Sequence, residues 1–383
     1  MSRVRVMHVV DTLRIGGTER VAVNLASLLP RNRYETYLAT TREEGPLARL
    51  VSPHVGRLAL VRRGKLGILA LQSFVEFVRQ RDIRILHAHG SALFFARLAS
   101  MFPPFPKVVW HDHYGRYAFN DRPVALYRLA TRGIAGVIAV NRSLEKWSRE
   151  SLRVPADRVW YIPNLVQVGS WTDLASELPG TAGHRIVCVA NIRPQKDHFN
   201  LLAAMRLLKQ ENPRAHLLLV GDYADKQYCE AVLRRIDELG LAKEVTYLGA
   251  RSDVPALLRA CDVGVLGSQS EGLPLALLEY GVAHLPAVAT AVGQCPEVLA
   301  NGAAGVLVPP SSPEALAEAL RELLDSPRKR EELAANLKTR LESQYSPATV
   351  IRRVCEVYSS VLNDQTPDRD EDLAAVDFGE AHR

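Results

Sequence analysis

This chain of 383 residues lacks several common signatures, and each absence excludes a class of protein. Its five cysteines form no CxxC pair and stand far apart, at positions 188, 229, 261, 295 and 355. Such scattered cysteines argue against a disulfide framework and a zinc site, and they fit the reducing cytosol. No apolar run reaches the roughly 18 residues that a transmembrane helix needs. Met1–Val10 becomes strand-like too early for a signal peptide.

Neither a GxGxxG dinucleotide fingerprint nor a nucleic-acid-binding motif is present. Charge is nevertheless uneven: residues 1–170 hold 26 Lys and Arg against 12 Asp and Glu, and residues 171–383 hold 22 against 30. A basic half attracts phosphates, anionic lipid headgroups or nucleic acid. Because no nucleic-acid motif accompanies it, we expect a phosphorylated substrate or an anionic membrane surface. A solvated arginine-rich surface is the alternative.

Alternating strand and helix patterns predict an α/β fold with a parallel, doubly wound sheet in each half. In the first half, strands are expected near 4–10, 35–39, 56–60, 84–87, 107–111, 136–140 and 158–162. Helices are expected between them, one after Thr18 that runs to about residue 29, and others near 66–80, 91–100, 121–132 and 143–151. In the second half, strands are expected near 185–190, 217–220, 245–248, 262–266, 286–289 and 305–308. Helices are expected to about residue 211 and near 312–325, 328–343 and 347–361.

These patterns divide the chain into five segments. We predict an N-terminal Rossmann-like domain over residues 1–165 and an irregular linker over 166–184. A C-terminal domain follows over 185–345, and then a final helix over 346–362. The remaining residues, 363–383, are acidic and are expected to be disordered.

The most informative stretch contains two carboxylates, Glu271 and Glu279, that stand eight positions apart. Val263–Leu266 before them has the pattern of a buried parallel strand, and the glycine and proline after Glu271 predict a turn and a helix start. Glu271 then lies at the carboxyl end of a strand, where open α/β sheets bind ligands. The helix N-terminus suits a phosphate or a sugar oxygen, and an ionised Glu279 suits a diol such as ribose. Two merely solvated glutamates are the alternative.

Three cationic residues follow other strands of the second half. Arg193 and Lys196 lie in a loop that enters a helix, and together with that helix N-terminus they can form an anion site. Because Glu271 is predicted at the same sheet edge, we favour this interpretation over two solvated cations. Arg251 is a candidate for lining a base pocket, although its neighbour Asp253 equally fits a plain helix start.

In the first half, Gly16 and Gly17 follow the first strand and allow the backbone to approach a ligand, although a plain turn has the same sequence. Thr18 is the predicted N-cap of the next helix. His111 ends a strand at the same sheet edge, where its imidazole can bond a hydroxyl or a phosphate, or act as a buried capping group. The His-Asp-His sequence that begins there lacks a clear third ligand, so we expect no metal.

Residues 56–79 combine a basic cluster with an apolar helix pattern. Arg57, Arg62, Arg63 and Lys65 form the cluster. Such a stretch can lie on a membrane surface. We favour the alternative of an ordinary helix that covers the sheet.

Four of these segments resemble the motifs of the retaining, nucleotide-sugar-dependent glycosyltransferases of family four, which have the GT-B fold. Glu271–Glu279 is similar to the E-x7-E motif of that family, and Val189–Lys196 to its diphosphate loop. Gly16–Arg20 is similar to its N-terminal glycine loop, and Trp110–Asp112 to the strand end that carries its active-site histidine. The similarity extends over about residues 4–360 and keeps the motifs in the family's order. The chain departs from the family pattern at Asn191, Asp197 and Tyr223, where glycine is common.

The resemblance implies two Rossmann-like parallel-sheet domains that face each other across a cleft. The N-terminal domain is then the acceptor side, the C-terminal domain binds the nucleotide-sugar donor, and the helix at 346–362 crosses back to the first domain. Arg193 and Lys196 are implied to hold the donor diphosphate, and Glu279 the ribose.

The resemblance also implies the residues around the transferred sugar. Glu271 and the backbone of Gly272, Leu273 and Leu275 would hold this sugar, and His111 would contact it. Gly16 and Gly17 would approach the donor phosphate and the acceptor.

The implied reaction is transfer of a sugar from a UDP- or GDP-linked donor to a glycan or lipid-linked acceptor, with retention. The product would belong to a cell-surface polysaccharide or other glycoconjugate. We expect no metal and no cofactor, because cations can stabilise the leaving diphosphate and no Asp-x-Asp motif stands in the expected place. A cytoplasmic location is expected, including a peripheral position on the inner face of the plasma membrane. The alternatives are a non-catalytic nucleotide-sugar-binding subunit of a synthase complex and a GT-B epimerase or phosphorylase.

Overall fold

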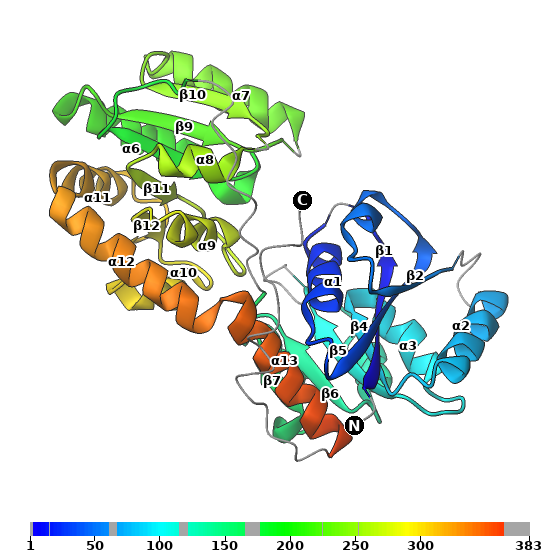
Figure 1. Ribbon diagram of the computed structural model, residues 1–383. Coiled ribbons are helices and arrows are strands. Elements are labelled where there is room, and N and C mark those ends of the chain that lie inside the picture. Colours follow the sequence, from blue (N-terminus) through cyan, green and yellow to red (C-terminus); the bar gives the residue numbers. More distant parts are fainter. Residues whose placement is uncertain are drawn as a thin grey trace. The chain divides into compact units, whose positions relative to one another are not determined.

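The computed structural model describes residues 3–14, 16–60, 67–114, 122–164, 177–223, 225–251 and 253–363. The chain divides into two compact units, which are Met1–Gln167 with Pro347–Arg383, and Val168–Ser346. Each unit is built around one parallel sheet, shown in Figure 1. Residues 166–176 of the predicted linker, the predicted tail from 364 onward, and Arg62, Arg63 and Lys65 lie outside the described residues.

The first unit has a seven-stranded sheet in the order β3-β2-β1-β4-β5-β6-β7. Its strands are β1 Val4–Thr12, β2 Tyr34–Glu43, β3 Gly56–Ala59, β4 Ile85–His89, β5 Lys107–Asp112, β6 Gly136–Ala139 and β7 Val159–Tyr161. Its helices are α1 Gly17–Leu28, α2 Ile68–Gln80, α3 Leu93–Ala99, α4 Val124–Thr131, α5 Arg142–Glu150 and α13 Pro347–Leu362. All seven predicted strands are present, within a few residues of their expected bounds.

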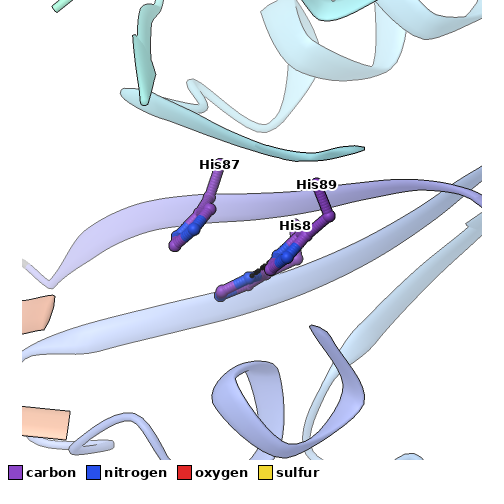
Figure 2. A group of neighbouring side chains, drawn as sticks. All are labelled: His8, His87 and His89. Carbon is purple, nitrogen blue, oxygen red and sulfur yellow. Dashed lines mark hydrogen bonds between the residues drawn. The ribbon is translucent and has the colours of Figure 1, made fainter. Parts of the chain in front are cut away.

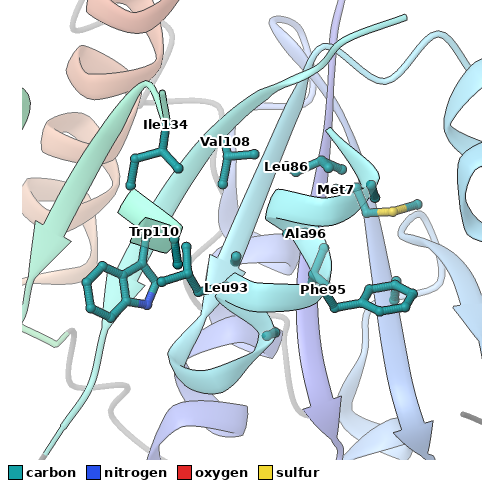
Figure 3. Packing of buried hydrophobic residues seen from close by; sticks show 14 of the residues in the cluster. Met7, Leu86, Leu93, Phe95, Ala96, Val108, Trp110 and Ile134 are labelled. Carbon is teal, nitrogen blue, oxygen red and sulfur yellow. The ribbon is translucent and has the colours of Figure 1, made fainter. Parts of the chain in front are cut away.

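Both faces of this sheet are buried, because successive strand side chains point to opposite sides. Met7, Leu86, Val108 and Trp110 face one layer of helices, and Figure 3 shows them packed against Leu93, Phe95 and Ala96 of α3. Phe74 and Val78 of α2 join the same cluster, so α2 covers the sheet as an ordinary amphipathic helix does.

The other face packs against α1 and α13. Val6, Ile85 and Val109 lie in one cluster with Ile351 and Tyr358 of α13. The last helix of the described chain therefore completes the core of the first unit.

The second unit has a six-stranded sheet in the order β10-β9-β8-β11-β12-β13. Its strands are β8 Arg185–Val189, β9 His216–Val220, β10 Val245–Gly249, β11 Val263–Leu266, β12 Ala287–Thr290 and β13 Val306–Val308. Its helices are α6 His198–Glu211, α7 Lys226–Glu238, α8 Val254–Arg259, α9 Leu275–Val282, α10 Cys295–Val298, α11 Pro313–Asp325 and α12 Pro327–Gln344.

Two helices differ from the sequence prediction. Helix α7 was not predicted, because it buries only the narrow stripe of Cys229, Val232 and Ile236 among charged residues. Residues 290–297 were predicted as a loop, but they contain the short helix α10.

The order of strands reverses beside the first strand of each sheet, between β1 and β4 in the first unit and between β8 and β11 in the second. Open α/β sheets bind ligands outside the carboxyl ends of the strands at such a reversal. Within the described residues, no helix is both long and apolar enough to span a bilayer.

Candidate active site

A buried ion pair lies at the strand reversal of the second unit. The Lys196 Nζ atom lies 2.6 Å from Glu271 Oε1, and the two side chains are only 12% and 7% exposed. Lys196 follows β8 and Glu271 follows β11, so the adjacent carboxyl ends of these strands bring them together. The predicted proximity of these two residues is present in the structure.

The Glu271 carboxylate is fixed by a second donor. The Ser268 hydroxyl donates to the same oxygen, Oε1, at 2.6 Å. Ser268 is itself held because the Thr290 hydroxyl donates to its carbonyl at 2.6 Å. Charge-assisted bonds of this length are strong, so the Lys196 ammonium has a defined position.

Arg193 lies three residues before Lys196, ahead of a short 3₁₀ turn over Pro194–Lys196. Its Nε atom is buried and has no hydrogen-bond partner among the described residues. A buried N–H donor without an acceptor is costly, so this atom is available to an anion from outside the chain.

The loop between β8 and α6 is anchored by the residues that depart from the family's glycines. Asp197 has φ of 48°, a left-handed conformation that Asp tolerates better than most residues. Its carboxylate accepts from the Asn200 amide at 3.3 Å, as the N-cap of α6, and from Gln269 Nε2 at 2.9 Å. Asn191 Oδ1 accepts from the Asp222 amide at 3.1 Å, which ties this loop to the turn after β9. Asp197 and Asn191 thus hold this loop through side-chain hydrogen bonds that glycine could not make.

Helix α9 begins next to Glu271 at Leu275, and no described side chain caps it. The amide of Leu277 donates to the Pro274 carbonyl at 3.0 Å, whereas the amides of Leu275 and Ala276 have no backbone acceptor among the described residues. In the described structure, a Cβ at Gly272 would meet no atom within 4 Å, so the backbone there is open to a ligand. Leu275 is 45% exposed, and the amide of Gln294 donates to the Gly272 carbonyl at 3.2 Å.

Glu279 lies in the second turn of α9 and is partly buried. The described residues give its carboxylate neither an ion pair nor a hydrogen bond. Burial raises its pKa from 4.5 to about 7. A carboxylate without partners in a partly buried position gains most from hydroxyl donors that a ligand supplies.

Arg251 is engaged within its own loop. Its Nε and a terminal guanidinium nitrogen donate to the two Asp253 oxygens at 2.7 and 2.5 Å. Asp253 is therefore more than a helix-start residue, because it orients Arg251. The role of Arg251 in base binding remains a prediction.

In the first unit, Gly16 rather than Thr18 is the N-cap of α1, which begins at Gly17. The prediction for Thr18 is wrong, because the chain enters the helix two residues earlier. None of the side chains that the structure describes caps this helix, and a Cβ at Gly17 would meet open space. A Cβ at Gly16 would instead meet the Glu19 carboxylate, so the backbone at the carboxyl end of β1 is open at Gly17 but not at Gly16.

His111 stands near the end of β5, in a cluster of five buried or partly buried histidines. The cluster consists of His8, His87, His89, His111 and His113. His8 and His87 are register partners across β1 and β4, and His89 and His111 across β4 and β5. Figure 2 shows the rings of His8, His87 and His89 beside one another.

Two rows of hydrogen bonds run through this cluster. His8 Nδ1 pairs with His89 Nε2 at 3.0 Å, and His89 Nδ1 pairs with His113 Nε2 at 3.0 Å. In the other row, the Tyr358 hydroxyl lies 2.6 Å from His87 Nδ1, and His87 Nε2 lies 3.0 Å from His111 Nδ1. Burial lowers the pKa of His8 and His113 to about 3 and those of the other three well below the ordinary value.

Two triads in the cluster, His8/His87/His89 and His89/His111/His113, have nitrogens within 4.8 Å of one another. Metal ligation requires lone pairs that converge on one point about 2 Å away. The rings instead lie beside one another, with interplanar angles from 1° between His87 and His89 to 31° between His89 and His111. Their facing nitrogens already pair with each other, so the arrangement favours a hydrogen-bonded array over a metal centre.

A buried arginine organises the chain after β5, and sequence reasoning missed it. Arg122 makes two bonds to Asp112, at 2.7 and 3.2 Å. Its guanidinium lies 4.2 to 5.4 Å from the ring centroids of four aromatic residues, Trp110, Tyr114, Tyr127 and Trp147. Such a paired and stacked guanidinium fixes Asp112, the residue next to His111.

The structure therefore gathers the predicted site residues into two groups, one in each unit. Arg193, Lys196, Glu271 and the start of α9 form the group of the second unit. His111 and the start of α1 lie at the carboxyl edge of the sheet in the first unit. The missed histidines carried a signal, because His-x-His places two imidazoles on one face at the end of a strand.

Two family models match consecutive parts of the chain. The model described as Glycosyltransferase Family 4 matches residues 15–170, and the model described as Glycosyl transferases group 1 matches residues 171–340. Both models describe enzymes that transfer sugars, and each covers most of one parallel-sheet unit. The chain belongs to the family 4, group 1 glycosyltransferases. The predicted enzyme class, glycosyltransferase, is confirmed.

Curated relatives match most of the chain. The UDP-Gal:alpha-D-GlcNAc-diphosphoundecaprenol alpha-1,3-galactosyltransferase of Escherichia coli is 26% identical over 314 residues, which are 75% of this chain and 79% of that protein. The N-acetyl-alpha-D-glucosaminyl L-malate synthase of Bacillus anthracis is 28% identical over 252 residues, 62% of this chain and 65% of that protein.

Solved structures share the fold. The HepE protein of Anabaena in complex with UDP superimposes with a TM-score of 0.78 at 20% identity, and the match covers 94% of this chain and all of that one. A glycosyltransferase from Rickettsia africae gives a TM-score of 0.80 at 18% identity and covers 95% of this chain and all of that one. The predicted GT-B fold is confirmed.

Proposed function

We propose that this glycosyltransferase moves a sugar from a UDP- or GDP-linked donor to a lipid-linked or glycan acceptor, with retention, in the assembly of a cell-surface glycoconjugate. The observation that carries the proposal is the buried Lys196–Glu271 pair beside the open start of α9. Family membership favours this reaction over an epimerase or a non-catalytic subunit.

The positive groups of the second unit suit a diphosphate. Lys196 is held in place by Glu271, the buried Nε of Arg193 lacks a partner among the described residues, and α9 adds free amides. All three are in place before a ligand arrives, so they need no reorganisation as charge develops on the leaving group. They also supply the charge that a divalent cation would otherwise provide, and we propose a reaction without metal or cofactor.

The names and complexes of similar proteins point to UDP as the nucleotide of the donor. The Escherichia coli relative is named for UDP-Gal, and the Anabaena structures are complexes with UDP, UDP and glucose, and UDP-glucose. Tyr223, 48% exposed, stands after β9 where the family commonly has glycine. Because it adds bulk near the predicted nucleotide site, GDP and UDP donors must both be tested.

Retention fits the state of Glu271. Its Oε1 accepts from both Lys196 and Ser268, which draws electron density away from the carboxylate. This oxygen is already engaged in holding Lys196, so we assign Glu271 a positioning role and not that of a covalent nucleophile. We therefore propose that a phosphate oxygen of the departing diphosphate takes the acceptor's proton on the same face, while Glu271 orients Lys196 and the transferred sugar.

A lipid-linked acceptor suits the surface of the first unit. Ile68 and Leu69, at the start of α2, are 64% and 79% exposed, and Met101, Phe102 and Phe105 are also exposed. Exposed apolar side chains beside a basic surface are typical of proteins that bind anionic membranes peripherally. We propose that the protein works at such a surface, on the cytoplasmic face of the plasma membrane.

Turnover of a labelled donor tests the proposal. We expect UDP release from UDP-galactose or UDP-glucose, with an undecaprenyl-linked or free glycan acceptor, to fall about 100-fold or more in Lys196→Ala. Lys209→Ala is the matched control: it removes a lysine of the following helix α6, which pairs with Glu244 in a partly exposed position, and it should leave turnover unchanged. Undiminished turnover in Lys196→Ala would contradict the proposed site.

Two further readouts separate the finer parts of the proposal. A thermal-shift comparison of UDP, GDP and their hexose conjugates identifies the base. NMR of the product shows whether the anomeric configuration of the donor is kept, and an inverted product would contradict retention.

A further inference from the structure

Three buried side chains of the first unit form a continuous row that ends at His111. Tyr358 of α13 contacts His87 of β4 through its hydroxyl at 2.6 Å, and His87 contacts His111 of β5 at 3.0 Å. Each of the three is no more than 1% exposed. The far nitrogen of His111, Nε2, is buried and has no partner among the described residues.

All three groups are neutral at physiological pH. Burial holds the pKa of the Tyr358 phenol well above its ordinary value, and it holds the pKa of His87 and His111 well below theirs. A neutral imidazole has one N–H donor and one lone-pair acceptor. The row must therefore run in one direction, with every donor facing an acceptor.

The phenol decides that direction. His87 Nδ1 is the only hydrogen-bond partner that the described structure gives the Tyr358 hydroxyl. If His87 were the donor to the phenol, the buried O–H would have no acceptor, which is costly. The phenol therefore donates to His87 Nδ1, His87 Nε2–H donates to His111 Nδ1, and the proton of His111 is left on Nε2.

We propose that Tyr358 and His87 are positioning residues that hold His111 as its Nε2–H tautomer, so that it donates a hydrogen bond to an oxygen of the transferred sugar. This inference rests on the proposed function of His111 as the residue that contacts that sugar. It assigns a role to α13, which follows the last helix of the second unit in sequence and packs in the core of the first.

The second row of histidines provides an internal contrast. His8, His89 and His113 are joined by two hydrogen bonds of 3.0 Å, but none of the described residues places a hydroxyl at either end of this row. The polar neighbour at the His113 end is the Asn164 amide, which can donate or accept and so does not fix a direction as a phenol does. Only the row that ends at His111 carries a phenol among the described residues.

Tyr358→Phe removes the hydroxyl and keeps the ring. In the full-length protein with ¹⁵N-labelled histidine, long-range ¹H–¹⁵N spectra report which ring nitrogen of His111 carries the proton, and His111→Gln identifies the signals. We expect an Nε2–H tautomer in the wild type and a mixture in Tyr358→Phe. With UDP-galactose as the probe, kcat should fall about tenfold while KM changes less than about twofold.

Tyr34→Phe is the matched control, because Tyr34 packs edge-on against Tyr358 in the same cluster, while the described structure gives it no hydrogen bond or ring contact with His87 or His111. It should leave both the tautomer and kcat unchanged. An unchanged His111 tautomer in Tyr358→Phe overturns the proposal, and so does a changed tautomer with an unchanged kcat.

His87 gives a second, independent variant pair. His87→Gln keeps an N–H donor at the position of Nε2 and should retain the Nε2–H tautomer and most of kcat, whereas His87→Leu should lose both. If the wild type fails to transfer sugar from any donor, the proposed function fails, while the NMR comparison still decides whether the row sets the tautomer.

Discussion

Glu279→Gln tests the electrostatics of the second unit in the most direct way. The Glu279 carboxyl is partly buried on α9, and burial raises its pKa from 4.5 to about 7. Between these two values, the folded protein holds a proton that the unfolded chain has already released. Folding stability must then fall as the pH rises through this window, because the unfolded state binds fewer protons.

The size of the effect follows from the shift. Where the folded state binds one proton more than the unfolded state, the free energy of unfolding falls by about 1.4 kcal/mol per pH unit. From pH 4.5 to about pH 7 the total loss is about 3 kcal/mol. Glutamine is neutral at every pH, so the stability of Glu279→Gln should not fall in this pH range. We expect Glu279→Gln to match the wild type near pH 4.5 and to exceed it by up to about 3 kcal/mol above pH 7.

Urea unfolding at a series of pH values measures this difference. The two units need not unfold together, so the transition of the second unit is identified as the one that Leu278→Ala in its core displaces. Glu332→Gln is the matched control, because this exposed glutamate of α12 undergoes the same change of charge. Parallel stability curves for wild type and Glu279→Gln would refute the argument that burial controls this carboxyl.

The same carboxyl links pH to donor binding. If the ionised form accepts hydroxyls of the ribose, affinity for UDP-glucose should rise about tenfold per pH unit below pH 7 and level off above it. Glu279→Gln should bind weakly and without this slope. A sloping curve in Glu279→Gln would assign the pH dependence to another group.

Three other variants test separate features. Arg122→Met leaves the buried Asp112 unpaired and should destabilise the first unit by about 3–5 kcal/mol, measured by urea unfolding with tryptophan fluorescence. A loss below about 1 kcal/mol would contradict this expectation. Adding Asp112→Asn to Arg122→Met should restore part of the lost stability. Gly221→Ala should lower the melting temperature by more than Gly183→Ala does. Both glycines have positive φ, but of the two only Gly221 would place a Cβ against a backbone carbonyl. Equal thermal shifts would disprove this. The wild-type protein should float with anionic vesicles at low salt and lose this binding at high salt, and Leu69→Glu should weaken it. If the wild type does not float at low salt, the membrane proposal is wrong.

The sequence predicted the strands well because parallel strands buried on both faces are short, continuous apolar runs. It predicted less well the helices that bury little. Helix α7 contributes only Cys229, Val232 and Ile236 to the core, and α10 is four residues long. Such elements are fixed by the sheet they cover, so their own sequence carries a weak signal.

The pair of Lys196 and Glu271 could be predicted although 75 positions separate them. Each residue follows a strand of a parallel sheet, and all carboxyl ends of such a sheet lie at one edge. Knowledge of the two strands was therefore enough to predict a common edge. The structure added that β8 and β11 are neighbours, which makes the contact direct.

The contact between Tyr358 and His87 could not be predicted in the same way. The two residues are 271 positions apart, and Tyr358 lies on a helix instead of at a strand end. Its position depends on the return of α13 to the first unit, and on which face of that helix meets the sheet. The apolar residues of α13 select this face, since Val350, Ile351 and Val354 must be buried together with the phenol ring. If Tyr358 sets the tautomer of His111, as we propose, then packing at the other end of the chain controls a group that the residues around His111 alone do not define.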